Sequence, residues 1–320
     1  MAGRLSFFIC VCVTSFMCLL AAPADAASAP KRAPTPALRP AVDAELVQPA
    51  MWKITNGKST VYLLGSLHVL PTDFNWRTQA IEKAISAADV FMFEANIDFA
   101  TTEFHYFVDH QGYLPPGQTL ASKLSPAARD RYMELIKTTR IDRNKVDYLR
   151  PGVAVLLLQQ VYFAGHGNLA PGVDASLLRE AKDQGKQVGY LETLQSQFEV
   201  LAAIGGGAEV TMLEKSLVDM RDGGDKYPAM LAAWSQGDLA KLISLNDQDA
   251  SQTDLLLYGR NKVWVPKIEA LLGTAKTYLI TVGAAHLAGK DSVIDLLCKK
   301  HWKMERVQTG AIPPPPACPA

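Results

Sequence analysis

The sequence predicts an α/β fold with a mixed, partly parallel sheet and a helical insertion in the middle of the chain. Three observations support this prediction. Two buried strand-like stretches, residues 61–68 and 278–286, each end in Gly-x-x-His. The apolar runs over residues 61–94 have the spacing of a strand–helix–strand unit. Residues 208–246 carry helical patterns without strand signals, which is typical of an inserted helical segment or cap.

The two Gly-x-x-His stretches organise the prediction. Both are continuous apolar runs rich in β-branched and aromatic residues, as expected for strands covered on both faces. We expect each glycine to let the chain turn sharply as it leaves the sheet. His68 and His286 then follow the carboxyl ends of their strands, where open α/β sheets hold their ligands. The repetition suggests that both histidines face one crevice.

Turn and helix signals define the elements around the first of these strands. The fold is expected to begin with a strand at residues 51–55, because Asn56-Gly57 between two strand-like runs is a strong hairpin signal. A helix over residues 77–88 has its apolar residues on one face, and a strand follows at residues 90–94. A βαβ unit of this kind requires parallel pairing.

The rest of the chain is mostly helical. Helices are predicted over residues 125–137, 153–164, 175–184, 208–221, 228–236, 238–246, 251–272 and 291–300, and from Leu194 onward. Short strands are predicted at residues 188–192 and 302–307. Asp174 stands immediately before one of these helices, where an acidic side chain is a common N-cap.

Both ends of the chain are predicted to lie outside the folded domain. Arg4, the apolar residues 5–20 and the small-x-small site Ala24-Asp25-Ala26 predict a signal peptide and export to the periplasm or the medium. The apolar run is short for a transmembrane helix, so we expect no stable membrane insertion after cleavage. The predicted order is a signal peptide (1–26), an Ala/Pro-rich leader (27–48), one domain (49–309) and a Pro-rich tail (310–320).

Charge and cysteine content narrow the choice of partner and compartment. The chain has 320 residues and a formal net charge of zero, without a basic cluster interleaved with aromatics, which argues against nucleic acid as a partner. Cys298 and Cys318 remain after signal removal. In an oxidising compartment they either form a disulfide that ties the tail to the last helix or stay as two thiols, and their spacing leaves both alternatives open.

His68, Glu94 and His286 are the first candidates for chemistry. Glu94 ends the strand at residues 90–94, so all three side chains are expected at neighbouring strand ends. Two neutral imidazoles and a carboxylate are a common ligand set for a divalent ion with open coordination positions. In the alternative, each histidine caps its strand or bonds a nearby carbonyl group, and the strand pattern alone does not separate the two.

Several motifs, in order along the chain, resemble those of the TraB/GumN family, and most closely its GumN-like branch. They are Gly65-Ser66-Leu67-His68, Trp76-Arg77, Phe93-Glu94, Leu114-Pro115-Pro116-Gly117-Gln118-Thr119-Leu120, Gly172-Val173-Asp174, Leu191-Glu192-Thr193 with Gln197, Arg260-Asn261-x-x-Trp264 and Gly283-Ala284-Ala285-His286-Leu287. The resemblance runs from Trp52 to Val307. The family includes the Tiki metalloproteases, and erythromycin esterases and haem-binding ChaN-like proteins share its fold.

The resemblance implies a three-layer α/β/α fold, with active-site positions at His68, Glu94, Arg260 and His286. Other residues have a functional and a structural interpretation. Glu192 is a second metal ligand, a general base or supporting residue, or a carboxylate that caps a helix. Asp174 orients a ligating histidine or is a structural N-cap. Arg260 stabilises an oxyanion or binds a substrate carboxylate, or is simply ion-paired. Asn261 is a weaker catalytic candidate.

These residues lead to the hypothesis of an exported metal-dependent hydrolase, with a peptidase favoured. A manganese, cobalt or zinc ion on His68, Glu94 and His286 would activate water. Glu192, Arg260 and Asn261 would complete the catalytic set, with a peptide or a small molecule as substrate. Two alternatives remain open. One is a metal-free ester or amide hydrolase with a histidine as general base. The other is a non-catalytic protein that binds haem or a peptide.

Overall fold

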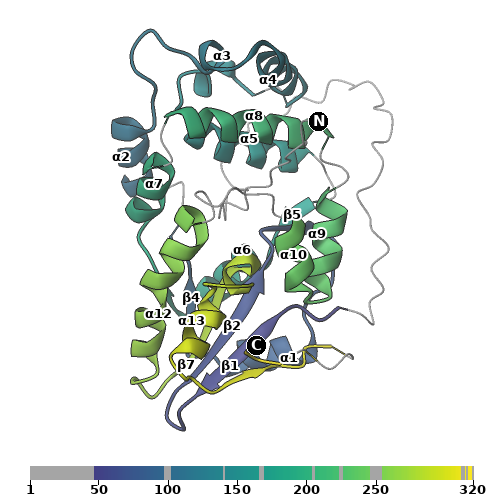
Figure 1. Ribbon diagram of the computed structural model, residues 1–320, viewed down its shortest axis with the longest axis vertical. Coiled ribbons are helices and arrows are strands. Elements are labelled where there is room, and N and C mark those ends of the chain that lie inside the picture. The colour runs from purple at the N-terminus through teal and green to yellow at the C-terminus, as the bar shows by residue number, and fades with distance from the viewer. Residues whose placement is uncertain are drawn as a thin grey trace.

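The fold combines a six-stranded mixed sheet, flanked by helices, with a helical part beyond one end of the sheet (Figure 1). The computed structural model describes residues 47–96, 102–139, 141–165, 169–203, 206–222, 226–245, 254–310, 314 and 316–318. The predicted signal peptide and nearly all of the predicted leader lie outside the described residues.

The sheet has the strand order β6-β4-β7-β2-β1-β8. Its strands are β1 (Met51–Thr55), β2 (Thr60–Ser66), β4 (Val90–Phe93), β6 (Gln187–Tyr190), β7 (Thr277–Gly283) and β8 (Met304–Arg306). A separate two-stranded sheet joins β3 (Val69–Pro71) to β5 (Leu169–Pro171), a pair that the sequence did not predict.

Helices make up most of the remaining described chain. They are α1 (Gln79–Ala87), α2 (Thr102–Gln111), α3 (Leu120–Lys123), α4 (Pro126–Thr139), α5 (Pro151–Gly165), α6 (Val173–Asp183), α7 (Leu194–Ala203), α8 (Gly206–Asp222), α9 (Lys226–Ser235), α10 (Leu239–Leu245), α12 (Gly259–Leu271) and α13 (Val293–Lys299). Shorter turns are η2 (Arg143–Lys145), the π-helical η3 (Asp254–Tyr258) and η4 (Ala284–Leu287). Within the described residues, no helix combines the length and apolar character needed to span a bilayer.

Parallel pairing brings the ends of three strands to one edge of the sheet. Strand β7 lies between β2 and β4, with Ser66 opposite Gly283 and Phe93 opposite Thr281. The residues that follow these strands therefore lie side by side, as the βαβ prediction requires. Strands β1 and β8 are antiparallel to their neighbours, which makes the sheet mixed.

Alternate strand residues face two separate apolar cores. Leu64 and Leu279 pack in one core with residues of α1 and α6. Leu63 and Ile280, their neighbours in the strands, pack in the other core with residues of α12 and α13. Because both faces of the sheet are buried, the central strands β2, β4 and β7 are largely apolar. The three-layer α/β/α fold is therefore confirmed.

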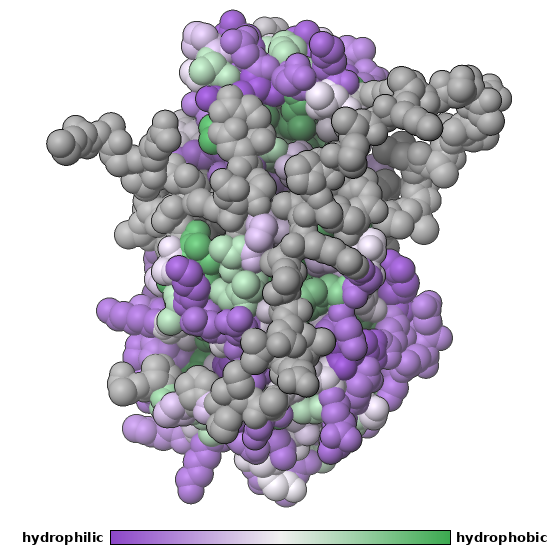
Figure 2. Space-filling view, turned by 90° about the vertical axis from the view of Figure 1, so that its right-hand side faces the viewer, coloured by the Kyte–Doolittle hydropathy of each residue, from purple (hydrophilic) through white to green (hydrophobic). Residues whose placement is uncertain are grey.

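The predicted helical insertion is present and has a core of its own. Buried residues of α3, α4, α5, α7 and α8 form this third core, with Tyr132, Leu158 and Leu213 almost completely inaccessible. Helices α9 and α10 instead pack against the sheet core that contains α1, and Trp234 of α9 donates its indole N–H to the Gly65 carbonyl at 2.9 Å. On the face shown in Figure 2, hydrophilic residues cover both parts, and apolar residues gather at mid-height between them.

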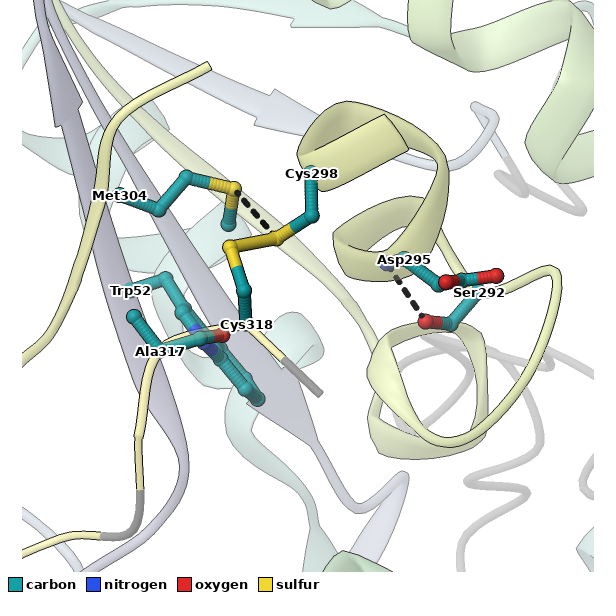
Figure 3. The surroundings of a disulfide bond; sticks show 7 residues. All are labelled: Trp52, Ser292, Asp295, Cys298, Met304, Ala317 and Cys318. Carbon is teal, nitrogen blue, oxygen red and sulfur yellow. Dashed lines mark hydrogen bonds between the residues drawn. A yellow bond between two sulfur atoms is a disulfide. The ribbon is translucent and has the colours of Figure 1, made fainter. Parts of the chain in front are cut away.

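The end of the chain is held against the sheet. Cys298 of α13 and Cys318 form a disulfide, so the structure contains the first of the two alternatives for this pair (Figure 3). The indole N–H of Trp52 donates to the Ala317 carbonyl at 3.0 Å. The guanidinium of Arg306 stacks on the Trp52 ring, with its central carbon 3.9 Å from the ring centre. Ala317 and Cys318 are thus tied to β1 and α13.

Candidate functional site

Gly283, the last residue of β7, marks the centre of a cluster of polar side chains. A methyl group added to Gly283 would lie 3.4 Å from Glu94 Oε1, 3.4 Å from His68 Nε2 and 3.7 Å from His286 Cδ2. The backbone N–H of Gly283 donates to Glu94 Oε1 at 2.7 Å. The φ of Gly283 is −50°, which any residue adopts. The backbone therefore does not require glycine for the sharp turn expected from the sequence, and a methyl group here would be in ordinary van der Waals contact with the three side chains.

His68 is positioned by the start of α6. The backbone N–H groups of Gly172 and Val173 donate to the carbonyls of His68 and Leu67, at 2.8 and 3.1 Å. A side chain at Gly172 is excluded, because its Cβ would lie 1.8 Å from the Leu67 carbonyl oxygen. Asp174 follows at once, and its Oδ1 lies 3.0 Å from His68 Nδ1. The carboxylate accepts the Nδ1 proton, so Nε2 carries the lone pair toward Gly283.

Asp174 is the second residue of α6 and does not cap it. The N-cap is Gly172, without a side-chain cap bond, so the predicted N-cap role of Asp174 is wrong. The carboxylate is buried and turned toward the His68 ring. The sequence pattern was misleading because the helix begins at Val173, two residues earlier than its apolar periodicity indicates. The alternative role, that of orienting a histidine, matches the observed contact.

His286 lies in the short helix η4 and is held as a neutral ring. Its Nδ1 lies 2.7 Å from Asn261 Oδ1, while the Asn261 amide nitrogen donates to the Asp291 carbonyl at 3.0 Å. This orientation of the amide assigns the proton to Nδ1 and leaves a lone pair on Nε2. Burial lowers the pKa of His286 to about 3, and the nearby charge of Arg260 acts in the same direction, against the opposing effect of Glu94.

Arg260 occupies the space between the carboxylates and His286. Its Nη2 lies 2.5 Å from Glu94 Oε2 and 2.5 Å from Glu192 Oε1. Its Nη1 donates to the Leu256 carbonyl at 3.1 Å and to His286 Nε2 at 3.2 Å. Its Nε donates to both Glu192 oxygens, at 3.1 and 3.2 Å. A guanidinium has five N–H donors, and each has an acceptor within the protein.

Both carboxylate oxygens of Glu192 accept hydrogen bonds from within the protein. Besides the Arg260 contacts, its Oε2 accepts the indole N–H of Trp264 at 3.1 Å. The Trp264 ring packs against His286, with ring centres 4.4 Å apart, and the guanidinium carbon of Arg260 lies 4.7 Å from the Trp264 ring centre. In this arrangement Glu192 and Trp264 hold Arg260 in place. The Glu192 carboxylate thus accepts three N–H groups from within the protein.

The structure brings together every residue that the sequence singled out for chemistry. Hydrogen bonds join Glu94, His286, Arg260, Glu192 and Asn261, and the His68–Asp174 pair adjoins this group at Gly283. Sequence reasoning missed the role of Trp264, which touches Glu192, Arg260 and His286. Its spacing was the available signal, since Arg260 and Trp264 lie four residues apart on α12 and so share a helix face.

The predicted ligand set fits a divalent ion in its chemistry but not in its arrangement. Both histidines present Nε2 to the centre, with each Nδ1 held by an oxygen, as metal-binding histidines usually are. The guanidinium of Arg260, however, bonds Glu94 Oε2 and His286 Nε2 at once. Across the described part of the chain, no three His, Cys, Asp or Glu side chains are arranged to hold a metal ion. The residues as placed therefore do not fit the ion.

The cluster is nearly closed to solvent. The side chains of Glu94 and His286 are 6% and 3% exposed, while those of His68 and Arg260 are 9% and 10% exposed. Charges at such depth interact strongly and are weakly screened by salt.

Fold and site together define a three-layer α/β/α protein with two histidines, carboxylates and an arginine gathered at the ends of its central strands. Comparison of sequences gives the family. The chain belongs to the TraB/PrgY/gumN family, whose sequence model matches residues 50–306.

Two relatives show how far the similarity extends. YbaP of Escherichia coli (strain K12), described as an uncharacterized protein, is 23% identical over 244 residues, which cover 75% of this chain and 89% of YbaP. Metalloprotease TIKI1 of Danio rerio is 24% identical over 315 residues, which cover 81% of this chain and 63% of that protein. No solved structure matches the chain. The distant similarity to a protein named as a metalloprotease points to hydrolase chemistry within the family.

Proposed function

We propose that this protein is a hydrolase that cleaves an amide or ester bond in a peptide or small molecule, with His68 as the general base. The observation that carries the proposal is the His68–Asp174 pair, in which Nδ1 is bound at 3.0 Å and Nε2 is directed to the Gly283 centre. The similarity to a protein named as a metalloprotease supports a peptide substrate.

The pair performs the proton transfers of hydrolysis. His68 Nε2 takes a proton from a water molecule as that water attacks the carbonyl carbon, and the imidazolium returns the proton to the leaving group. Asp174 holds the ring in the Nδ1–H tautomer and stabilises the imidazolium between the two steps. Glu94 fixes the Gly283 backbone, and the low pKa of His286, about 3, keeps that ring neutral throughout.

This mechanism differs from the sequence-based hypothesis in two roles. Proton transfer is assigned to His68 and not to Glu192, because the Glu192 carboxylate already accepts N–H groups from Arg260 and Trp264. Arg260 is a positioning residue, since its donors are bound to protein acceptors. Ion-dependent hydrolysis, which the sequence predicted, requires a different placement of Arg260.

We also propose that the protein works in an oxidising compartment outside the cytoplasm. The Cys298–Cys318 disulfide supports this proposal, because such bonds persist in oxidising surroundings. The apolar N-terminal stretch with its small-x-small site supports export. Fractionation of expressing cells, combined with the intact mass of the exported chain, tests both points. A full-length chain found in the cytoplasm with free thiols would contradict them.

Hydrolysis assays test the catalytic proposal. Purified protein is screened against a peptide library and a set of ester substrates, with and without EDTA and with added manganese, cobalt or zinc. We expect His68→Ala to lower kcat by about 10²–10⁴-fold and Asp174→Asn by at least about tenfold. His110→Ala removes an exposed histidine of α2 and serves as the matched control.

The outcomes separate the competing hypotheses. Hydrolysis that is lost in His68→Ala but retained in EDTA supports the proposed mechanism. Hydrolysis that depends on an added ion favours the metal-dependent form. Absence of turnover with every substrate, together with saturable binding of haem or a peptide, would favour the non-catalytic role.

A further inference from the structure

Arg260 bonds the same two atoms that a metal ion at the centre of the cluster would bind. The guanidinium bonds Glu94 Oε2 at 2.5 Å and His286 Nε2 at 3.2 Å, and these are the two atoms that an ion at the centre would need. Metal–oxygen and metal–nitrogen bonds are about 2.0–2.2 Å long, so an ion and the guanidinium cannot use these atoms together. Glu94 Oε2 and His286 Nε2 are 3.8 Å apart, a separation that one bound cation can bridge.

The charges of the cluster favour a cation. Glu94, Glu192 and Asp174 contribute three carboxylates, and Arg260 is the arginine that contacts two of them. Buried carboxylates without a counter-charge are strongly destabilising, so some cation is required at this place. The histidine rings add neutral nitrogen donors, which suit divalent transition ions.

We propose that Arg260 is the resident cation of this site, and that it competes with a divalent metal ion for Glu94 and His286. With Arg260 in place, the site is closed to the ion. Removing the guanidinium while keeping the carboxylates and histidines opens a divalent-ion site. The inference rests on the same cluster as the proposed hydrolase but not on catalysis, because ion binding can be measured without a substrate.

Calorimetric titration tests the competition directly. Wild-type protein, Arg260→Gln and Arg260→Met are stripped with EDTA and titrated with manganese, cobalt and zinc. Glutamine keeps a polar side chain at position 260. Methionine keeps an unbranched apolar chain that can pack on Trp264. The two neutral variants therefore replace the packing of Arg260 in different ways. We expect both to bind one ion at least about tenfold more tightly than wild type, since the competing cation is gone.

Two control variants test whether the increase in ion affinity arises at this cluster. Arg260→Gln combined with His286→Ala should lose the increase, because a proposed ligand is missing. Arg77→Gln is the matched arginine control. Arg77 also bridges two carboxylates, Glu82 and Glu180, but at a more exposed place without histidines. We expect Arg77→Gln to leave ion affinity at the wild-type level.

Several results would overturn the proposal. Wild-type protein that binds an ion as tightly as Arg260→Gln and Arg260→Met would show that the guanidinium does not compete. An equal gain in Arg77→Gln would show a nonspecific charge effect. If the neutral variants are unfolded without an ion, circular dichroism should show refolding when one is added, and failure of all three ions to restore the fold also contradicts the proposal. Loss of hydrolysis has no bearing on these readouts.

Discussion

The indole N–H of Trp264 donates to Glu192 Oε2 at 3.1 Å, and this bond anchors the carboxylate that in turn holds Arg260. Trp264 is fully buried and lies on α12, while Glu192 follows β6. A buried carboxylate oxygen that loses a donor keeps its desolvation cost. Trp264 therefore links the core of the α/β part to the charge arrangement of the site.

Trp264→Phe should test this link. Phenylalanine keeps an aromatic ring but lacks the N–H and part of the indole, so we expect the free energy of unfolding to fall by about 1–3 kcal/mol from the unpaired carboxylate oxygen, with a further loss of packing. Chemical denaturation measures the change. The matched control is Trp302→Phe, which removes a similar indole bond to Glu269, 2.9 Å long, near the surface. There we expect about 1 kcal/mol or less, because water can replace the donor. Equal losses in both variants would contradict the special role of Trp264.

Gly283→Ala should affect activity more than stability. The added methyl would make ordinary contacts with Glu94, His68 and His286, and the backbone conformation tolerates alanine. We expect unfolding free energy to change by about 1 kcal/mol or less, while the methyl fills the space where the attacking water must sit. Gly207→Ala on α8, which has open space around it, is the control and should be neutral or slightly stabilising. Full activity in Gly283→Ala would show that the reaction does not take place beside Gly283.

Gly172→Ala should be far more damaging than Gly283→Ala. Its Cβ would lie 1.8 Å from the Leu67 carbonyl oxygen, so α6 must move away from the end of β2. This movement breaks the two backbone hydrogen bonds from Gly172 and Val173 and takes Asp174 away from His68. We expect a loss of about 3 kcal/mol or more in unfolding free energy. Thermal unfolding by circular dichroism is the measurement, and a melting temperature near that of wild type would contradict the close approach.

Acid should weaken the ion pair between Arg77 and Glu82. The hydrogen bond from Arg77 lowers the pKa of Glu82 below its ordinary value of 4.5, although burial opposes this shift. A lowered pKa adds stability above the unfolded-state pKa, and this contribution is lost as pH falls through the folded-state pKa. We therefore expect wild type to unfold at a higher urea concentration than Glu82→Gln at pH 7, with the difference narrowing as the pH falls below the ordinary pKa of 4.5. A gap that is unchanged at acidic pH would exclude this coupling.

Loss of the Cys298–Cys318 disulfide should lower stability without altering the site. The bond closes a loop with a sequence separation of 20 residues, and loops of this length contribute about 2–4 kcal/mol. We expect Cys318→Ser to reduce unfolding free energy by this amount in urea titrations. A reducing agent should lower wild type to the same value and leave Cys318→Ser unchanged. A further loss in the reduced variant would point to an effect other than the disulfide.

Much of the fold follows from local patterns in the sequence. The Asn56-Gly57 hairpin, the strand at residues 90–93 and the helix at residues 79–87 lie within a few residues of their predicted positions. The paired Gly-x-x-His stretches also predicted that His68 and His286 approach one another. Strands β3 and β5 were missed because each has three residues, too few for a hydrophobic period to appear.

The sequence by itself determined the alternation of strands and helices, the buried sheet and the set of polar residues that gather at the strand ends, because each depends on burial or residue type along a short stretch. Tertiary structure decided the partners: Asp174 binds His68 instead of capping α6, and Arg260 lies between Glu94 and His286. A long charged side chain takes whichever counter-charge folding brings within its reach. That choice depends on how α12 crosses the strand ends, and no local pattern in the sequence records it.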